Sequence, residues 1–515
     1  MRPLIIHGHF YQPPRENPWT FVVDQEPSAA PFHDWNQRVT AECYQPNSQV
    51  RITGEGGVEK LVNNYALINF DFGPTLLSWL EHAAPETYAR IISADAESAR
   101  RHSGHGNAIA QAYSHAILPL CNERDLRTQL RWGLADFRHR FNREAEAIWL
   151  PETACNDEVM AALIDEGLRF VILAPRQAKR TRTDGSASGK RPGEWRSAEE
   201  GSIDTSLPYR YLHRDGSNRS IAVFFYDQSL AGAIAFECAL TSSEVLVDRI
   251  ARVPDGAGSL VNVATDGESY GHHHKFGDLC LAYALEAEAP RRGFSVTNYG
   301  EYLEQHPPAT EVEINSGPGN HGTSWSCIHG VGRWRSDCGC ETGGEPHWNQ
   351  DWRRPLRTAL DYLRDEAALH FEATRGELFI DPWRARDASI ELTLDELKSR
   401  EAFLSRRAPR ALSRADEIRA LLFLEMQRHT LLMYASCGWF FNDISGIESV
   451  LVLRYAGRAI ELMDQLGLPS PRERFLEILA DAKSNKAGMG TGADIFLTMV
   501  DKVRIDSNSD LIFSE

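Results

Sequence analysis

Two short stretches of the sequence place carboxylates where they could do chemistry. IWLPETA sets Glu152 directly after a short apolar run, and VATDGESYGHHH sets Asp266 and Glu268 after another. Cleavage of a glycosidic bond needs one carboxylic acid for the leaving oxygen and one carboxylate for the anomeric carbon. The pattern therefore favours glycosidic chemistry, while a helix cap or an ion pair with arginine is the alternative role for each acid.

A histidine pair stands at the beginning of the chain, in HGHFYQP. His7 and His9 lie on the same side of an extended strand end, because side chains alternate with a period of two. Such a pair can clamp a metal, as in zinc hydrolases, or hydrogen-bond a sugar. With no obvious acidic third ligand nearby, sugar binding without a metal is the favoured interpretation. A metal-dependent carbohydrate hydrolase or deacetylase that uses both histidines is the second hypothesis.

Six apolar runs alternate with amphipathic stretches and read as buried strands. They cover residues 4–8, 66–70, 147–150, 170–173, 221–226 and 260–264. Between the third and fourth, Asn156 caps a predicted helix that ends at Gly167, which makes a tight β-α-β unit. Repeated units of this kind imply parallel strands covered by helices, closed into a barrel or wound as an open sheet. In either fold the carboxyl ends of the strands meet, so Glu152 and Asp266 are expected at one face.

A basic Gly/Ser-rich stretch, residues 178–195, has no hydrophobic periodicity. It lacks the spacing of a phosphate-binding P-loop, so a solvated excursion between strands is expected, with a phosphate-binding loop as the alternative.

Composition limits the partners of the chain. Its 515 residues carry 55 basic and 72 acidic side chains, a formal net charge of −17, which argues against nucleic acid. A carbohydrate or another small or neutral molecule suits this charge better. Only residues 4–6 are apolar at the N-terminus, too few for a signal peptide or a membrane span. Nine cysteines, an odd number, favour thiols in a reducing compartment, so a cytoplasmic protein without membrane attachment is expected.

A Gly/Trp/Cys-rich segment brings four soft ligands close together in sequence, Cys327, His329, Cys338 and Cys340. Their number suits tetrahedral zinc, but one-residue gaps are tighter than the usual spacing. Reduced thiols are therefore the expected state and structural zinc is the alternative; no cofactor is expected for the reaction.

The last third of the chain is predicted to be helical. Residues 415–435 form one long candidate. In residues 448–469, one face is predicted to consist of Tyr455, Ala459, Leu462 and Leu466, before a stop at Gly467 and Pro469. The expected division is a catalytic barrel over 1–305, a connecting insert near the cleft over 306–355 and a helical domain that completes the active site over 356–515.

Four stretches in order, HGHFYQP, FDFGPTLLSWL, IWLPETA and TDGESYGH, resemble the first four conserved regions of glycoside hydrolase family 57. The resemblance implies a (β/α)7 barrel followed by helices, with Glu152 as nucleophile and Asp266 as acid/base. Family members are amylases, branching enzymes and 4-α-glucanotransferases acting on α-glucans. The Cys-rich insert and CGWFFNDISGIE depart from the better-known members, which indicates a separate bacterial branch with a distinct C-terminal helical domain.

The resemblance also implies which residues bind the sugar. In LLMYASCGW, which looks like the fifth region of the family, Trp439 is the expected sugar contact. The others are His7, His9, His115, Glu268, Tyr270 and His272.

The implied reaction is double displacement, with hydrolysis and transfer differing only in the acceptor. Asp266 must begin protonated, and the neighbouring charge of Glu268 together with partial burial would raise its pKa. The retaining mechanism predicts roughly 5–6 Å between the carboxyl groups of Glu152 and Asp266. A carbohydrate-binding protein without catalysis is the third hypothesis.

Overall fold

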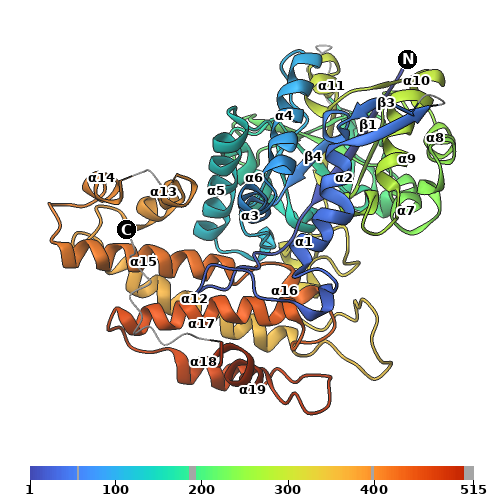
Figure 1. The fold of residues 1–515 in the computed structure, drawn as a ribbon. Coiled ribbons are helices and arrows are strands. Elements are labelled where there is room, and N and C mark those ends of the chain that lie inside the picture. Colours follow the sequence, from blue (N-terminus) through green and yellow to red (C-terminus); the bar gives the residue numbers. More distant parts are fainter. Residues whose placement is uncertain (55–56, 185–192, 396–398, 504–515) are drawn as a thin grey trace. The chain divides into compact units, whose positions relative to one another are not determined.

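The computed structural model describes residues 1–54, 57–184, 193–395 and 399–503, which divide into two compact units (Figure 1). The first, called the barrel unit here, consists of Met1–Gln12, Gln25–Tyr113 and Leu118–Gly330. The second, the helical unit, consists of Pro13–Asp24, Ser114–Ile117 and Val331–Glu515. The main boundary between the two units therefore follows Gly330, inside the segment 306–355 that was predicted to connect two domains.

Parallel strands form the centre of the barrel unit. In spatial order they are β1 (Arg2–Phe10), β4 (Asn69–Phe72), β5 (Ala110–Gln111), β6 (Ile148–Trp149), β7 (Phe170–Leu173), β11 (Ser220–Phe225) and β12 (Val261–Asp266). Strand pairing joins β12 to β1, β1 to β4, β5 to β6 and β7 to β11.

Single contacts complete the ring between the shorter strands. Parallel bridges link Phe70 to Ala108 and Ala147 to Phe170, next to β5 and β7. A backbone hydrogen bond of 2.8 Å from Asp227 to the Asn262 carbonyl joins the ends of β11 and β12. The described residues thus form a seven-stranded barrel, as the resemblance to family 57 implied, and not the open sheet that the strand pattern also allowed.

Helices connect and cover these strands (Figure 1). Those of the barrel unit are α1 (Trp35–Val39), α2 (Gln45–Ser48), α3 (Pro74–Ala83), α4 (Pro85–Arg101), α5 (Glu123–Phe141), α6 (Asp157–Asp165), α7 (Gln228–Phe236), α8 (Ser243–Ala251), α9 (Gly277–Tyr283), α10 (Ala289–Arg291) and α11 (Tyr299–Gln305). A hairpin of β2 (Val50–Gly54) and β3 (Gly57–Val62) and the short strand β13 (Phe294–Val296), paired with the start of β1, complete this part.

The period of two along each strand separates two cores. In β1, Leu4 and Ile6 pack in the outer layer between strands and helices, whereas Ile5 packs in an inner cluster with Trp149 and Phe224. Side chains at alternate positions point to opposite faces of a strand, so His7 and His9 continue the inner face that Ile5 begins. The alternation of side chains along β1 is therefore sufficient to direct both histidines into the barrel.

The basic stretch was wrongly predicted to be a solvated excursion over its first part. Residues Ala178–Thr183 form β8, which pairs with β14 (Thr310–Ile314); β10 (Tyr209–Leu212) and β9 (Arg196–Ser197) belong to the same sheet, which continues from β11. Cross-strand ion pairs hold β8, because Arg180 and Arg182 bind Glu313 and Glu311 at 2.7 and 2.6 Å. Charge pairing of this kind leaves no hydrophobic periodicity to detect. Residues 185–192 of the stretch lie outside the described residues.

A second difference concerns the strand predicted over 66–70. The backbone first makes a turn of 3₁₀-helix at Asn64–Ala66, because the Asn63 side chain accepts a hydrogen bond from the Tyr65 amide. The strand β4 begins only at Asn69, and it therefore includes Asp71.

The helical unit is built from the C-terminal third and two earlier segments. Its helices are α12 (Arg353–Glu372), α13 (Pro382–Leu394), α14 (Arg400–Ser405), α15 (Arg414–Leu432), α16 (Cys437–Phe440), α17 (Ile447–Gln465), α18 (Arg472–Leu479) and α19 (Gly492–Ile495). Both predicted long helices are confirmed as α15 and α17, and Gly467 ends α17 in a left-handed conformation. Tyr455, Ala459 and Leu462 are buried on α17, as predicted, whereas Leu466 lies just beyond the end of the helix and is half-buried. None of the described helices is long and apolar enough to cross a lipid bilayer.

Asn156 caps α6 as predicted, and this cap offers a test of the local fold. Its side chain accepts a hydrogen bond of 3.0 Å from the Val159 amide and donates one of 3.0 Å to the Asn320 carbonyl. Asn156→Ala removes both bonds and is expected to destabilise the barrel unit by about 1–2 kcal/mol, because a lost N-cap leaves a helix amide unsatisfied. Urea unfolding followed by circular dichroism measures the change.

Asn156→Asp is the matched control, since aspartate keeps the capping oxygen and loses only the donor to Asn320. We expect it to retain most of the stability that the alanine variant loses. Equal stability of the wild type and Asn156→Ala would contradict the role of the cap.

Candidate active site at the carboxyl ends of the barrel strands

A carboxylate joins the two histidines of β1. Asp71, at the carboxyl end of β4, lies across from them because β1 and β4 pair in parallel with His9 beside Asp71. Its two oxygens hydrogen-bond His7 Nε2 at 2.9 Å and His9 Nδ1 at 2.8 Å. Asp71 is thus an acidic neighbour of both histidines that the sequence did not reveal, and it occupies one ring nitrogen of each.

The two histidines carry different charges. Complete burial lowers the pKa of His7 and outweighs the attraction of Asp71, so this imidazole is neutral at physiological pH. Burial also acts against protonation of His9, but the negative charges of Asp71, Asp266 and Glu268 prevail and raise its pKa to about 9. The site therefore holds one fixed cation, His9, among its carboxylates.

Trp149, from β6, packs against both histidines inside the barrel. Its ring stacks on His7 with centroids 4.8 Å apart and on His9 at 4.9 Å. A cation held against an indole face gains electrostatic stabilisation from the ring. Trp149 thus fixes the plane of both imidazoles and supports the charged state of His9.

Glu152 follows β6 in an unusual backbone conformation. Glu152 and Thr153 both have positive φ angles, 60° and 50°, the left-handed region that residues other than glycine rarely adopt. Two such residues in succession store strain, which proteins retain mainly at functional positions. The chain turns away from the direction of β6 at Glu152, whose side chain is half-buried.

A distant segment holds the Glu152 carboxylate. Trp325 Nε1 and Ser326 Oγ donate hydrogen bonds to Glu152 Oε2 at 3.0 and 2.5 Å. The Trp325 amide also donates to the Glu152 carbonyl at 2.9 Å. Trp325 packs edge-on against Trp149 with centroids 5.2 Å apart. The nucleophile candidate is therefore clamped by side chain and backbone together.

Asp266 ends β12 and stands exposed to solvent at the mouth of the barrel. Protein atoms nevertheless surround it closely, and this desolvation, together with the charges of Glu268 and Asp71, raises its pKa to about 6 against the opposing effect of His9. The carboxyl is accessible to a substrate and is held near the protonation balance that a general acid needs.

Glu268 lies behind Asp266 and is buried. Its Oε1 accepts hydrogen bonds from Tyr44 Oη at 2.6 Å and from the Tyr11 amide at 3.2 Å. Burial raises the pKa of Glu268, while these two donors and His9 act in the opposite direction. This second carboxylate is thus fixed in place and exerts its charge on Asp266.

The charge of Asp266 acts on Glu152. Burial and the charge of Asp266 raise the pKa of Glu152, whereas the hydrogen bonds from Ser326 and Trp325 lower it. The barrel therefore brings together the two carboxyl groups that the sequence singled out, over a hundred residues apart. The predicted spacing of 5–6 Å stays a prediction.

The remaining predicted sugar-binding residues divide between the units. In the barrel unit Tyr270 is buried and hydrogen-bonded to Thr265, and His272 is paired with Glu42. In the helical unit His115 is buried, with a φ of 57° and Nδ1 at 2.7 Å from Ser436 Oγ. Trp439 is fully buried, and its Nε1 donates to the Arg353 carbonyl at 3.1 Å. Their sugar-binding roles stay predictions.

Asp71, Tyr44 and Ser326 are among the contacts of the site that the sequence analysis did not identify. Asp71 carries a signal that could have found it, because it alternates with Phe70 and Phe72 and so points into the barrel with the histidines. Tyr44 and Ser326 carry none, since 224 and 174 residues separate them from the carboxylates they contact.

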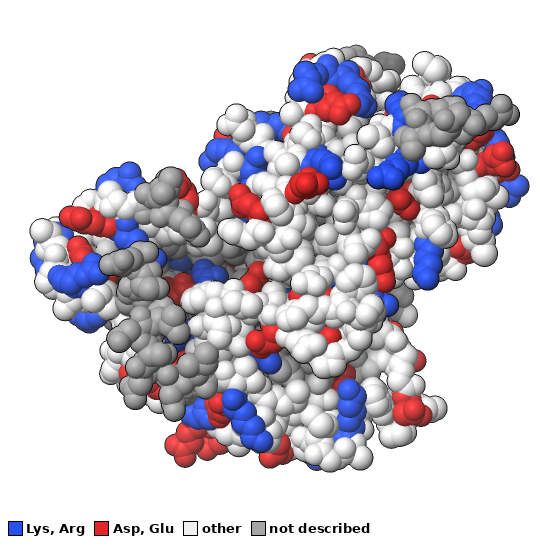
Figure 2. Space-filling view, viewed as in Figure 1, with Lys and Arg blue, Asp and Glu red and all other residues white. Residues whose placement is uncertain are grey.

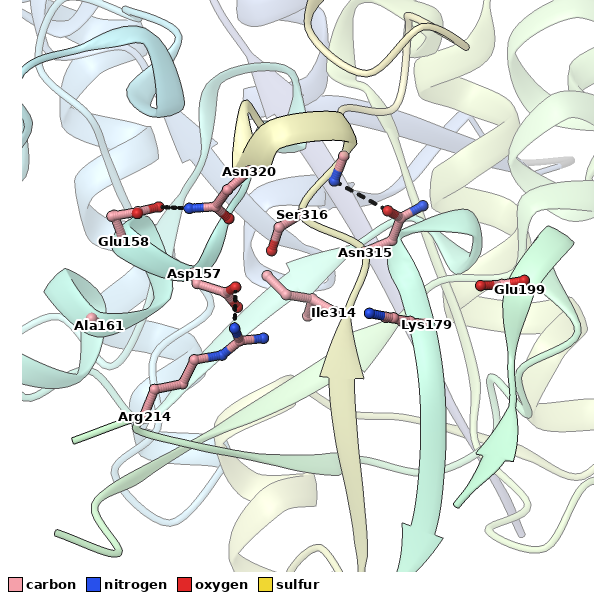
Figure 3. A pocket seen from close by; sticks show the side chains of 11 residues that line it. Asp157, Glu158, Ala161, Lys179, Glu199, Arg214, Ile314, Asn315, Ser316 and Asn320 are labelled. Atoms are coloured by element: carbon pink, nitrogen blue, oxygen red, sulfur yellow. Dashed lines mark hydrogen bonds and ion pairs between the residues drawn. The ribbon is translucent and has the colours of Figure 1, made fainter. Parts of the chain in front are cut away.

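A separate hollow of about 610 Å³ lies on the barrel unit (Figure 3). Its lining includes Asp157, Arg214 and Lys179 but neither Glu152 nor Asp266. Asp157 and Arg214 form an ion pair at 2.7 Å within it. The hollow therefore has paired charges on its wall and is distinct from the carboxylate site.

The molecular surface agrees with the charge argument from composition. On the face drawn in Figure 2, acidic and basic side chains are interspersed between larger neutral areas, and the described residues form no continuous basic area there. This face thus offers no extended surface for a polyanion.

Comparison with solved structures supports the fold. An exo-type maltose-forming amylase from Pyrococcus sp. ST04 superposes with a TM-score of 0.68 at 14% identity, over 93% of this chain and 82% of that one. A family 57 branching enzyme from Pyrococcus horikoshii gives 0.52 at 15% identity, over 93% and 94% of the two chains. A 4-alpha-glucanotransferase from Thermococcus litoralis gives 0.51 at 14% identity, over 90% and 60%.

Comparison with protein families covers both parts of the chain, whereas a search of curated proteins finds no match. A domain of unknown function, DUF3536, matches residues 348–509. The profile described as glycosyl hydrolase family 57 matches residues 9–315, which include Glu152, Asp266 and their partners. The chain therefore belongs to glycosyl hydrolase family 57, and it is an enzyme of the glycoside hydrolase type.

Proposed function

We propose that this enzyme cleaves an α-linked glucan or oligosaccharide with retention of anomeric configuration, and passes the glycosyl group to water or to a second sugar. One observation carries the proposal. Glu152 and Asp266 lie at the carboxyl ends of two strands of one barrel, where hydrogen bonds from Trp325 and Ser326 hold Glu152 and desolvation raises the pKa of Asp266 to about 6. The solved family 57 structures with the same fold are α-glucan enzymes by name, which supports this substrate class.

The difference between the two carboxyls lies in their hydrogen bonds. Glu152 accepts bonds from Trp325 and Ser326, and donors of this kind stabilise the ionised form. Desolvation is the main cause that raises the pKa of Asp266 to about 6, and it favours the protonated form. Glu152 is thus equipped as the carboxylate and Asp266 as the acid.

The proposed first step forms a covalent intermediate. A bond forms between a Glu152 oxygen and the anomeric carbon, the glycosidic bond breaks, and the proton of Asp266 goes to the departing oxygen. In the second step Asp266 takes a proton from water or a sugar hydroxyl, whose oxygen bonds to the anomeric carbon and releases Glu152. Both carboxyl groups return to their starting states.

Positive charge from His9 balances the site during these steps. His9 stands among Asp266 and Glu268 and attracts both, which limits the accumulated negative charge when both catalytic groups are ionised. We keep His9 and the fully buried His7 as proposed sugar contacts, together with Glu268, Tyr270, His272, His115 and Trp439.

The cytoplasm is the proposed location. This proposal is supported by the nine cysteines, an odd number, none of which is joined in a disulfide bond. The chemistry is assigned to the barrel unit.

The reaction can be tested with a panel of maltooligosaccharides and other α-linked oligosaccharides. We expect the wild type to form products with the α-anomer appearing first, as retention requires, observed by proton NMR before mutarotation. Glu152→Gln is expected to lower the rate by roughly a thousandfold or more, because the amide cannot form the intermediate.

Glu166→Gln is the matched control, since Glu166 on the far end of α6 pairs with Arg131 at 2.9 Å and touches none of the site residues. It should retain wild-type activity. First appearance of the β-anomer, or undiminished turnover by Glu152→Gln, would contradict the proposal.

The pKa of Asp266 predicts the pH dependence. Asp266 is protonated below about pH 6, so kcat/KM is expected to fall as pH rises through about 6, approaching a tenfold loss per unit. Glu268→Gln removes a neighbouring negative charge, lowers the pKa of Asp266 and should move this falling limb to lower pH. The measurement is kcat/KM against pH for both proteins.

Glu166→Gln again controls for the loss of one negative charge far from the site, and its limb should coincide with that of the wild type. A falling limb that stays in place in Glu268→Gln, or moves to higher pH, would overturn the assignment of that limb to Asp266.

Ser326 tests the clamp on the nucleophile. Ser326→Ala removes a donor to Glu152, so the pKa of Glu152 should rise and the rising limb of the pH profile should move to higher pH. Loss of a hydrogen bond to a charged group predicts a fall in kcat/KM of roughly 10- to 100-fold at low pH.

Two further variants separate this effect from a general disturbance of the loop. Ser326→Thr keeps a hydroxyl and should restore most of the activity, while Ser316→Ala, in the same segment but away from Glu152, should behave as wild type. A rising limb that does not move in Ser326→Ala would show that the hydroxyl does not act on Glu152.

A further inference from the structure

Four potential metal ligands converge in the loop that begins directly after Ser326. The sulfur atoms of Cys327, Cys338 and Cys340 and a ring nitrogen of His329 all lie within 4.8 Å of one another. All four residues belong to one continuous stretch, Cys327–Cys340, and their closeness is a property of this loop. Within the described residues no other group of three or more His, Cys, Asp and Glu side chains converges in this way.

The distances suit a tetrahedral ion. Bonds of about 2.3 Å from zinc to sulfur place the ligand atoms of a tetrahedron about 3.8 Å apart. A set within 4.8 Å therefore needs an inward movement of less than about 1 Å per atom pair to close on a zinc ion. No disulfide bond joins any of the nine cysteines, all of which lie in described residues, so the three sulfurs can act as thiolate ligands.

Two turns explain how ligands separated by only one residue can face a common metal ion in this loop. Gly330 has a φ of 81°, and its amide donates to the Cys327 carbonyl at 3.2 Å, which folds the Cys-x-His half. Gly339, between the other two cysteines, has a φ of 77° and donates to Asp337 Oδ1 at 2.9 Å. Left-handed angles of this kind cost glycine little. Each half thus presents two ligands from a turn, and the tight spacing is no obstacle.

Positive charge accompanies the Cys-x-Cys half. Arg353 is fully buried and its Nη1 donates to the Cys340 carbonyl at 3.0 Å, and Arg333 is also buried nearby. Thiolates are the form of cysteine that binds a metal. Three thiolates and a neutral imidazole around Zn²⁺ carry one net negative charge, which these arginines would offset.

We propose that Cys327, His329, Cys338 and Cys340 bind one structural Zn²⁺ ion. The site has four protein ligands and leaves no open position, as structural zinc sites do, whereas catalytic zinc keeps one position for water. Soft thiolates together with an imidazole favour zinc over magnesium or calcium.

The ion would also act on the active site through the chain. Cys327 is the residue after Ser326, whose hydroxyl binds Glu152, and Ser324 Oγ donates to the Gly330 carbonyl at 2.6 Å within the same loop. A metal that fixes Cys327 therefore restricts the two residues that clamp Glu152. This second step rests on the proposed function, and it makes Ser326 and Trp325 positioning residues that depend on the ion.

Metal content of the full-length protein tests the site itself. The protein, purified under reducing conditions without chelator, is expected to contain about one zinc per chain by elemental analysis. Replacement of zinc by Co²⁺ should give thiolate-to-cobalt charge-transfer bands and the intense visible bands of tetrahedral cobalt. The double variant C338S/C340S should lose the zinc and these bands.

Cys238→Ser is the matched control, because Cys238 is an exposed thiol outside the cluster. It should keep full metal content. Wild-type protein that binds neither zinc nor cobalt stoichiometrically would overturn the proposal, as would full metal content in C338S/C340S. If that variant fails to fold, His329→Ala, an exposed position, gives the second measurement: its cobalt spectrum must differ from that of the wild type.

The coupling to Glu152 has its own readout. Chelation should lower kcat/KM and move the rising limb of the pH profile to higher pH, as Ser326→Ala does, and added Zn²⁺ should reverse both changes. An unchanged profile in metal-free enzyme would exclude the coupling. Zinc bound without turnover of any α-glucan would instead refute the proposed function and leave the metal site standing.

Discussion

The bridge that Asp71 makes between His7 and His9 organises the charges of the active site. Both imidazoles point into the barrel because they continue the inner face of β1, and the parallel register with β4 places Asp71 beside them. Asp71 accepts a hydrogen bond from each, and its charge favours the cationic form of His9. His9 in turn attracts Asp266 and Glu268. Without this bridge the site would hold several carboxylates with no internal counter-charge, an arrangement that is costly in a poorly hydrated recess.

The position of Glu152 depends on a strained turn and on hydrogen bonds from a segment far away in the sequence. The left-handed turn at Glu152 and Thr153 directs the nucleophile candidate toward Trp325 and Ser326, which arrive from the end of the barrel unit. Strain in a turn persists only when its surroundings hold it, and here two side-chain hydrogen bonds and one backbone bond do so. The loop that supplies them continues into the cysteine cluster, so the same segment connects catalysis with the proposed zinc site.

Local patterns predicted the elements that carry the carboxylates. β6 and β12, which lead into Glu152 and Asp266, appear where apolar runs predicted strands, because burial is decided within a few residues. β7, β11 and α6 were also predicted, α6 from its Asn156 cap. β4 begins three residues later than predicted because of a polar turn after Asn63, and Asp71 therefore lay outside the predicted strand. β8 is held by cross-strand ion pairs, which leave no apolar pattern.

The rest of the site depends on contacts between segments far apart in the sequence, and local sequence patterns do not predict such contacts. Ser326 meets Glu152 across 174 residues, and Tyr44 meets Glu268 across 224. The cysteine cluster shows an intermediate case. Its ligands were visible in the sequence, but the glycine turns that make one-residue gaps workable become apparent only in the structure.

The identity of the nucleophile can be measured directly by trapping the covalent intermediate. A slowly turned-over fluorinated α-glucosyl fluoride should label the wild-type enzyme once per chain. Peptide mass spectrometry should then locate the sugar on Glu152. Labelling of another carboxylate, or rapid turnover of glucans with no label ever detected on Glu152, would contradict the account.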